Sequence, residues 1–85
     1  MLRTLIIDDE AHMRDSLTKI LAKKCPQVQV VGDAMTVASG LRTILELRPD
    51  LVLLDIQMPD GTGFDLLQSL PSIDFRIIFI TGQFM

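Results

Sequence analysis

Residues 51–63, Leu-Val-Leu-Leu-Asp-Ile-Gln-Met-Pro-Asp-Gly-Thr-Gly, constrain the fold of this 85-residue chain more than any other stretch. Four apolar residues run without interruption and end at Asp55. A continuous apolar run is typical of a strand that is buried on both faces. Pro59, Gly61 and Gly63 cannot continue a strand and indicate a turn-rich loop. Asp55 is therefore expected where a central strand leaves the core, the place where open α/β sheets bind their ligands.

The composition is that of one small globular domain. The chain has 48% hydrophobic and 22% charged residues, which is ordinary for a soluble protein. No stretch approaches the roughly 18 apolar residues of a membrane span. The lone Cys25 excludes an intrachain disulfide, and the net charge of -3 offers no basic surface for nucleic acid. We expect a cytoplasmic protein without a membrane partner.

Strand and helix patterns alternate along the chain. Apolar runs predict strands at residues 3–7, 28–31, 51–55 and 76–81, and helical spacing predicts helices at residues 11–24, 36–47 and 64–70. Such alternation predicts an α/β fold with a doubly wound parallel sheet, right-handed crossovers and helices on both faces. The second strand alternates with Gln27 and Gln29, which favours an edge position and places the first strand beside the third. Gly32 and Asp33 are expected to close that edge strand.

Two of the predicted helices have a clear apolar face. In the helix at residues 36–47, which Thr36 is expected to cap, the face comprises Val37, Leu41, Ile44 and Leu45. In the helix at residues 11–24 it comprises Met13, Leu17, Ile20 and Leu21. In the helix at residues 64–70, Phe64, Leu67 and Leu70 are the candidate core contacts.

The fourth predicted strand, residues 76–81, has nothing after it that would cover it. Ile77–Ile80 has the pattern of a strand buried on both faces, yet the sequence stops five residues later. A bare apolar strand is a template for aggregation. We therefore expect that the chain is a fragment of a longer protein, or else that a second copy covers the strand in a homodimer or by other self-association.

Acidic residues follow two of the buried strands. In a parallel sheet the carboxyl ends of all strands lie along one edge, so Asp8, Asp9, Asp55 and Thr81 are expected on the same rim. Three neighbouring carboxylates raise the pKa of one another, and a divalent cation removes that penalty. Oxygen ligands without Cys or His favour Mg²⁺.

Each of these groups also has a simpler explanation. The run Asp8-Asp9-Glu10 suits the first turn of a helix, where acids complement the helix dipole. Asp55 would suit the cap of a turn, and Thr81 is an ordinary strand former. The segment 59–61 predicts a turn without chemistry. The coincidence of an acid pair, a single acid and a hydroxyl at three strand ends favours a functional site.

Taken together, these motifs resemble the receiver domain of bacterial two-component response regulators over all 85 residues. The motifs are Leu5-Ile-Ile-Asp8-Asp9-Glu10, Asp50-Leu-Val-Leu-Leu-Asp55-Ile-Gln-Met-Pro59, Gly63, and Ile77-Ile-Phe-Ile-Thr81-Gly82. The resemblance implies a flavodoxin-like sheet of order 2-1-3-4 whose fifth strand is missing. Residues 1–85 would thus form a partial receiver domain.

The resemblance also implies a role for each site residue. Asp55 matches the aspartate that accepts a phosphoryl group from a sensor histidine kinase. Asp9 matches a direct Mg²⁺ ligand and Asp8 its neighbour, while Asp55 and the backbone carbonyl of Gln57 complete the metal site. Thr81 matches the switch hydroxyl that moves to the phosphoryl group. The family's lysine and aromatic switch residue, both associated with the fifth strand, have no counterpart in the sequence.

A receiver domain is a signalling module and not an enzyme. The loop at residues 58–67 is similar to receivers that precede LytTR-type DNA-binding domains, so a transcription-regulating effector is expected downstream. One alternative is a phosphorylation-independent interaction module, a pseudo-receiver. Another is a phosphatase of the haloacid-dehalogenase type, which requires a second Asp where this chain has Gln57.

Overall fold

The computed structural model describes residues 1–80, which contain four long strands, three helices and a short two-stranded hairpin. The four long strands are β1 (Leu2–Ile7), β2 (Val28–Ala34), β3 (Leu51–Asp55) and β6 (Arg76–Ile80). The helices are α1 (Ala11–Lys24), α2 (Val37–Leu47) and α3 (Gly63–Gln68), and the hairpin consists of β4 (Gln57–Met58) and β5 (Gly61–Thr62). Predicted Thr81 lies outside the described residues.

The long strands form one parallel sheet in the order β2-β1-β3-β6. The predicted doubly wound sheet of order 2-1-3-4 is therefore confirmed, with β6 as the fourth long strand. The half-polar β2 lies at one edge, as its alternation predicted. Among the described residues, β6 forms the opposite edge, and β1 and β3 lie side by side in the middle.

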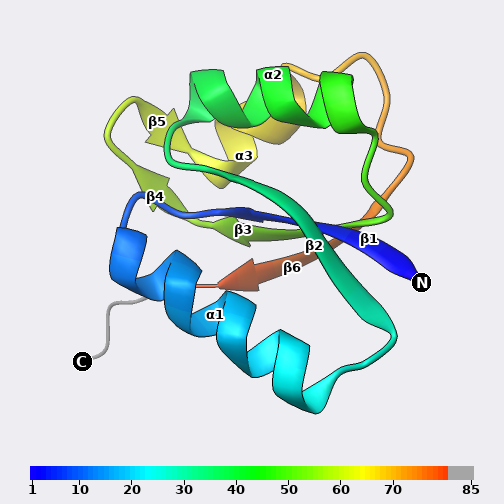
Figure 1. Cartoon of the computed structure of the whole chain (residues 1–85). Coiled ribbons are helices and arrows are strands. Elements are labelled where there is room, and N and C mark those ends of the chain that lie inside the picture. The colour runs from blue at the N-terminus through cyan, green and yellow to red at the C-terminus, as the bar shows by residue number, and fades with distance from the viewer. Residues whose placement is uncertain (81–85) are drawn as a thin grey trace.

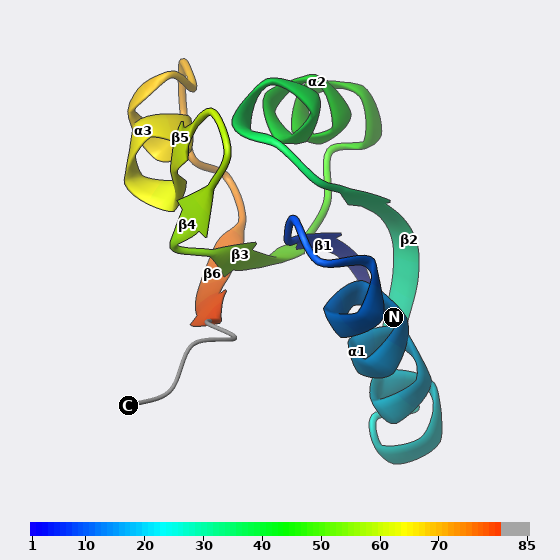
Figure 2. The same cartoon turned by 90° about the vertical axis from the view of Figure 1, so that its left-hand side faces the viewer.

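Helices lie on both sides of this sheet, with α2 and α3 on one face and α1 on the other (Figure 1, Figure 2). The main core lies beneath α2 and α3, where side chains from both helices pack on β1 and β3. Its buried members are Leu5, Ile7, Ala34, Val37, Ile44, Val52, Leu54, Met58 and Leu66. The predicted layered architecture is thus confirmed.

The face under α1 is more thinly covered. Ile6 alternates with the core residues of β1 and therefore points to the α1 side, where it is fully buried. No residue of α1 itself is buried, and Ile20, on its predicted apolar face, is 54% exposed.

Leu67 and Leu70 pack against the core as predicted, but Phe64 of α3 is 54% exposed, so its predicted core contact is wrong. Leu45, on the predicted apolar face of α2, is 56% exposed. It lies about 100° around the helix from Ile44, past the face that contacts the sheet.

Strand β2 is longer than the sequence predicts. Its pairing with β1 shifts between Thr4, which faces Val30, and Leu5, which faces Gly32, so Val31 is an extra, bulged residue. Beyond the bulge β1 continues to supply backbone partners as far as Ala34. The expectation that Gly32 and Asp33 end the strand is therefore wrong.

The loop after Asp55 folds back on itself as a small hairpin. Gln57 of β4 pairs with Thr62 of β5, and Met58 pairs with Gly61. Gly61 has a φ of 151°, a conformation that side chains rarely adopt. The turn predicted for residues 59–61 is confirmed, and the hairpin delivers the chain to the start of α3.

Candidate functional site

Asp8 and Asp55 lie next to each other at the carboxyl edge of the sheet. β1 and β3 are hydrogen-bonded neighbours whose residues Ile7 and Leu54 face each other, and each acid follows directly on one of them. Both carboxyl groups are withdrawn from solvent, with Asp8 only 1% and Asp55 only 7% exposed. The N–H of Asp8 donates to the carbonyl of Ala34 at 3.0 Å, which fixes the end of β1 against β2.

The surroundings of the two buried acids raise their pKa and so disfavour their ionised forms. Burial raises the pKa of Asp55, and the carboxylates of Asp8 and Asp9 raise it further, against a lowering by the N–H of Gln57. Burial likewise raises the pKa of Asp8, against a lowering by the N–H of Glu10. The ion pairs within residues 1–80 involve neither carboxylate. Such a site gains from a cation that neutralises it.

The acids that follow β1 do not cap α1. Glu10 is the N-cap residue, but its side chain makes no capping hydrogen bond, and the first turn of the helix contains no acid. The Asp8 carboxylate instead accepts the N–H of Glu10 at 2.8 Å, which orders the loop. The helix-capping explanation of this acidic run is therefore not supported.

One carboxylate oxygen from each of Asp8, Asp9 and Glu10 lies within 4.8 Å of the others. Asp55 does not belong to this group at that spacing, although Asp8 and Asp9 act on its pKa. From the sequence, Glu10 had only the simpler role of an acid at a helix start, so it is an additional candidate ligand. Oxygen ligands around a negative, half-buried site suit a hard divalent cation such as Mg²⁺.

Gln57 lies directly beside the candidate site. Its backbone N–H donates to Asp55 Oδ1 at 3.3 Å, while its side chain is exposed. The role predicted for its backbone carbonyl stays a prediction. The predicted switch hydroxyl of Thr81 lies outside residues 1–80, although the preceding residue, Ile80, pairs with Asp55.

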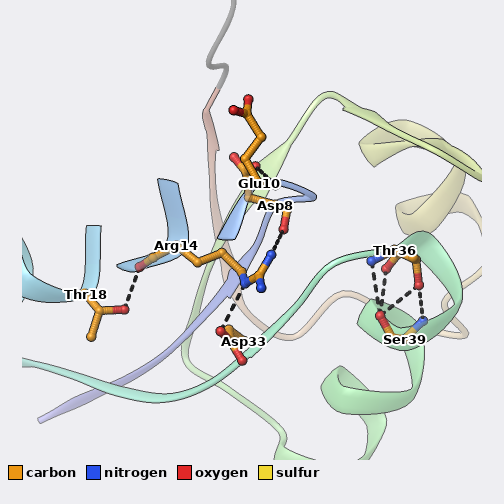
Figure 3. A network of polar contacts seen from close by, with 7 residues as sticks. All are labelled: Asp8, Glu10, Arg14, Thr18, Asp33, Thr36 and Ser39. Atoms are coloured by element: carbon orange, nitrogen blue, oxygen red, sulfur yellow. Dashed lines mark hydrogen bonds and ion pairs between the residues drawn. The ribbon is translucent and has the colours of Figure 1, made fainter. Parts of the chain in front are cut away.

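Arg14 holds the end of β1 in place through hydrogen bonds to two residues. Its Nη1 donates to the backbone carbonyl of Asp8 at 2.8 Å and its Nε to Asp33 Oδ2 at 3.1 Å. Figure 3 shows the guanidinium between these two residues, with Thr18 bonded to the carbonyl of Arg14. Nothing in the sequence pattern pointed to Arg14, because its partners are a backbone carbonyl and a residue of a distant strand.

Asp60 is a second residue whose contacts the sequence did not reveal. Its two carboxylate oxygens accept the N–H groups of Val37 and Ala38, at 2.8 and 3.1 Å. These hydrogen bonds lower the pKa of Asp60, the one to Val37 more strongly. Turn composition fully explained an Asp before Gly61, so nothing in the local pattern pointed to a helix more than twenty residues away.

Comparison with known proteins gives the family of this fold and site. The family model described as the response regulator receiver domain matches residues 4–85. The chain belongs to the response regulator receiver domain family. This confirms the resemblance drawn from the strand-end motifs.

Curated relatives of this receiver domain include several response regulators. An uncharacterised response regulatory protein of Vibrio parahaemolyticus is 48% identical over 83 residues, which are 96% of this chain and 34% of that protein. The sensory transduction protein LytT of Bacillus cereus is 40% identical over 84 residues, again 96% of this chain and 34% of the relative. The chain thus spans about a third of the length of these relatives.

Solved receiver structures share the fold. The response regulator domain of Thermotoga maritima CheB is 30% identical and superposes with a TM-score of 0.81, over 95% of this chain and 60% of that one. The receiver domain of a response regulator, NarL, from Mycobacterium tuberculosis is 28% identical with a TM-score of 0.84, over 99% and 68%. None of the helices in residues 1–80 has both the length and the apolar character that a bilayer crossing requires.

Proposed function

We propose that this receiver domain accepts a phosphoryl group on Asp55 from a sensor histidine kinase, with Mg²⁺ bound beside it. The observation that carries the proposal is the pairing of the ends of β1 and β3, which sets buried Asp55 next to buried Asp8 at the carboxyl edge of the sheet. The raised pKa of both acids supports a site built for a cation. The ligands would be Asp8, Asp9, Asp55 and the backbone carbonyl of Gln57.

In the proposed reaction a carboxylate oxygen of Asp55 attacks phosphorus as the nucleophile. A P–O bond to Asp55 forms while the P–N bond of the kinase phosphohistidine breaks. The departing imidazole nitrogen takes a proton from solvent, which leaves a neutral histidine. Bound Mg²⁺ supplies the charge neutralisation that phosphoryl transfer needs. Asp55 is held for attack by the N–H of Gln57, and Thr81 is proposed to bond the phosphoryl oxygen afterwards.

A direct test is to incubate the protein with Mg²⁺ and acetyl phosphate and to measure its mass. We expect one acid-labile phosphate per chain and none in Asp55→Ala. Asp74→Asn is a suitable control, because Asp74 is exposed in the loop before β6 and, among residues 1–80, its side chain hydrogen-bonds only to Ser72. Phosphate that persists in Asp55→Ala would contradict the assignment.

The domain is proposed to act as a signalling module and not as an enzyme, in the cytoplasm. We propose that residues 1–85 are part of a longer response regulator, since the match covers 34% of the LytT relative. Phosphorylation would then switch a C-terminal effector outside this segment, which we propose to be a LytTR-type DNA-binding domain that regulates transcription. Binding of the full-length protein to DNA with and without acetyl phosphate tests this proposal.

Two other functions make different predictions. A pseudo-receiver would bind partners without phosphate, and absence of Mg²⁺ binding near millimolar concentration would favour it. A haloacid-dehalogenase-type phosphatase would turn over phosphoesters, and it needs a proton donor at residue 57. The amide of Gln57 cannot act as a general acid, so we expect no turnover of phosphoesters.

A homodimer is proposed through strand β6. This strand is an edge among the described residues, and its apolar side chains Ile78 and Phe79 are 51% and 41% exposed. An edge with exposed apolar side chains pairs readily with another chain. Sedimentation velocity of the 85-residue chain should detect dimers or larger species, and Ile78→Lys should reduce them. A well-folded monomer at every concentration would contradict this proposal.

A further inference from the structure

The N-terminus of α2 is completed by a residue from another element. The first N–H groups of a helix have no partner inside it. Here the N–H of Ser39 donates to Thr36 Oγ1 at 3.0 Å, and the N–H of Thr36 donates to Ser39 Oγ at 3.1 Å. The N–H groups of Val37 and Ala38, which this capping box leaves free, donate to the two oxygens of Asp60. Thus Asp60 contributes half of the cap from the tip of the β4–β5 hairpin.

The base of the same hairpin is bonded to the segment that follows the buried acid. The N–H of Gln57 donates to Asp55 Oδ1 at 3.3 Å, and the N–H of Gly63 donates to the carbonyl of Ile56 at 2.9 Å. The hairpin is only two residue pairs long and is too short to hold its own position. Within residues 1–80, the two hydrogen bonds of Asp60 are the ones that join its tip to α2.

We propose that Asp60 is a positioning residue, which clamps the hairpin to α2 and thereby fixes the segment that carries Gln57 beside Asp55. The helix needs this carboxylate less than the hairpin does, because α2 has a complete capping box of its own. The hairpin, by contrast, has no other polar anchor to α2 in the part of the chain that is described. That Gln57 contributes to a Mg²⁺ site rests on the proposed function.

A matched pair of variants separates positioning from simple helix capping. Asp60→Ala removes the clamp, and Thr36→Ala removes the N-cap of the same helix without touching the hairpin. Asp60→Asn, which keeps one acceptor oxygen, provides a milder change if Asp60→Ala folds poorly. Two quantities are measured by NMR on the full chain: hydrogen exchange at the N–H of Gly63, and the Mg²⁺ dissociation constant from chemical shifts.

We expect faster exchange at Gly63 in Asp60→Ala than in Thr36→Ala, with Asp60→Asn in between. We also expect Mg²⁺ affinity to fall by about tenfold in Asp60→Ala, the lower end of the loss when a support of a metal ligand is removed. Thr36→Ala should bind Mg²⁺ like the unmodified chain. Equal exchange at Gly63 in the two alanine variants would overturn the proposal.

The two measurements also distinguish this inference from the proposed function. If the unmodified chain binds no Mg²⁺, the proposed metal site fails, and exchange at Gly63 still decides whether Asp60 clamps the hairpin. If Mg²⁺ binds equally well to Asp60→Ala and to the unmodified chain, the clamp does not position a ligand and the inference fails, while the metal site stands.

Discussion

The backbone of Gly63 lies directly against that of Asp55. A Cβ atom at Gly63 would meet the carbonyl oxygen of Asp55 at 2.7 Å and Cγ of Leu54 at 3.0 Å. The start of α3 can therefore lie over the end of β3 only because residue 63 has no side chain. This contact fixes how the loop after Asp55 returns to the core.

Gly63→Ala should destabilise the domain by about 2 kcal/mol, as other overpacking changes do. The reason is that a backbone oxygen on a buried strand cannot move aside. Urea unfolding measures the loss. Gly32→Ala is the matched control, since a Cβ there would meet the end of the flexible Leu47 side chain at 2.9 Å. A loss at Gly63 no larger than at Gly32 would contradict this explanation.

Arg48→Gly should stabilise the domain by about 1 kcal/mol. Arg48 ends α2 with a φ of 49°, which is left-handed, and its N–H donates to Ile44 while its carbonyl accepts from Arg3. Glycine adopts that conformation without strain and keeps both backbone hydrogen bonds.

The control for this prediction is the same substitution inside the helix. Arg42→Gly, at an exposed position in α2, should destabilise the domain by about 1 kcal/mol. Thermal or urea unfolding of both variants should give opposite signs. A loss of stability in Arg48→Gly would mean that its side chain makes a contact which outweighs the strain.

The sequence predicted most of the sheet and the position of the acids, because both follow from local patterns. Continuous apolar runs identified β1, β3 and β6, and the alternation of strands and helices gave the parallel order. Asp8 and Asp55 were placed on one rim by the same rule, since each directly follows a buried strand. Thr36 was identified as a cap from its place before an apolar helical face.

The contacts that the sequence did not reveal are long-range ones. Asp60 bonds to Val37 and Ala38, and Arg14 bonds to Asp33, across elements that only folding brings together. Phe64 was wrongly predicted as a core contact, and Leu45 and Ile20 are exposed on predicted apolar faces, because helical periodicity gives a face but not its width. The bulge in β2 depends on its pairing with β1, which no pattern within β2 shows.

Arg14→Lys should destabilise the domain by about 1 to 2 kcal/mol. The Arg14 side chain is 16% exposed, and its guanidinium spans two acceptors at once, the carbonyl of Asp8 and the carboxylate of Asp33. A single ammonium group does not reproduce that fork. The exposed pair of Lys19 and Asp15 is the control, and a double-mutant cycle there should give only about 0.3 kcal/mol. A loss of stability in Arg14→Lys no larger than this coupling energy would contradict a special role for Arg14.

Asp55→Asn should stabilise the metal-free domain at neutral pH and abolish its phosphorylation. Burial, with Asp8 and Asp9 adding to it, raises the pKa of Asp55 in the folded state above its ordinary value of 3.8. A raised pKa means that the stability gained from the protonated acid is complete below about pH 3.8 and is lost as pH rises through the folded-state pKa. The neutral amide of Asn escapes that loss.

Urea unfolding from about pH 7 to pH 4 without metal should therefore show an advantage of Asp55→Asn that shrinks as the pH falls. Asp60→Asn should instead be less stable than the unmodified chain throughout this pH range. The N–H groups of Val37 and Ala38 lower the pKa of Asp60, so its contribution is present above the unfolded-state pKa and is lost as pH falls through the folded-state pKa. Added Mg²⁺ should stabilise the unmodified chain more than Asp55→Asn and so close the gap between them at neutral pH. An advantage of Asp55→Asn that is the same at both ends of the pH range would show that its cause is not the buried charge.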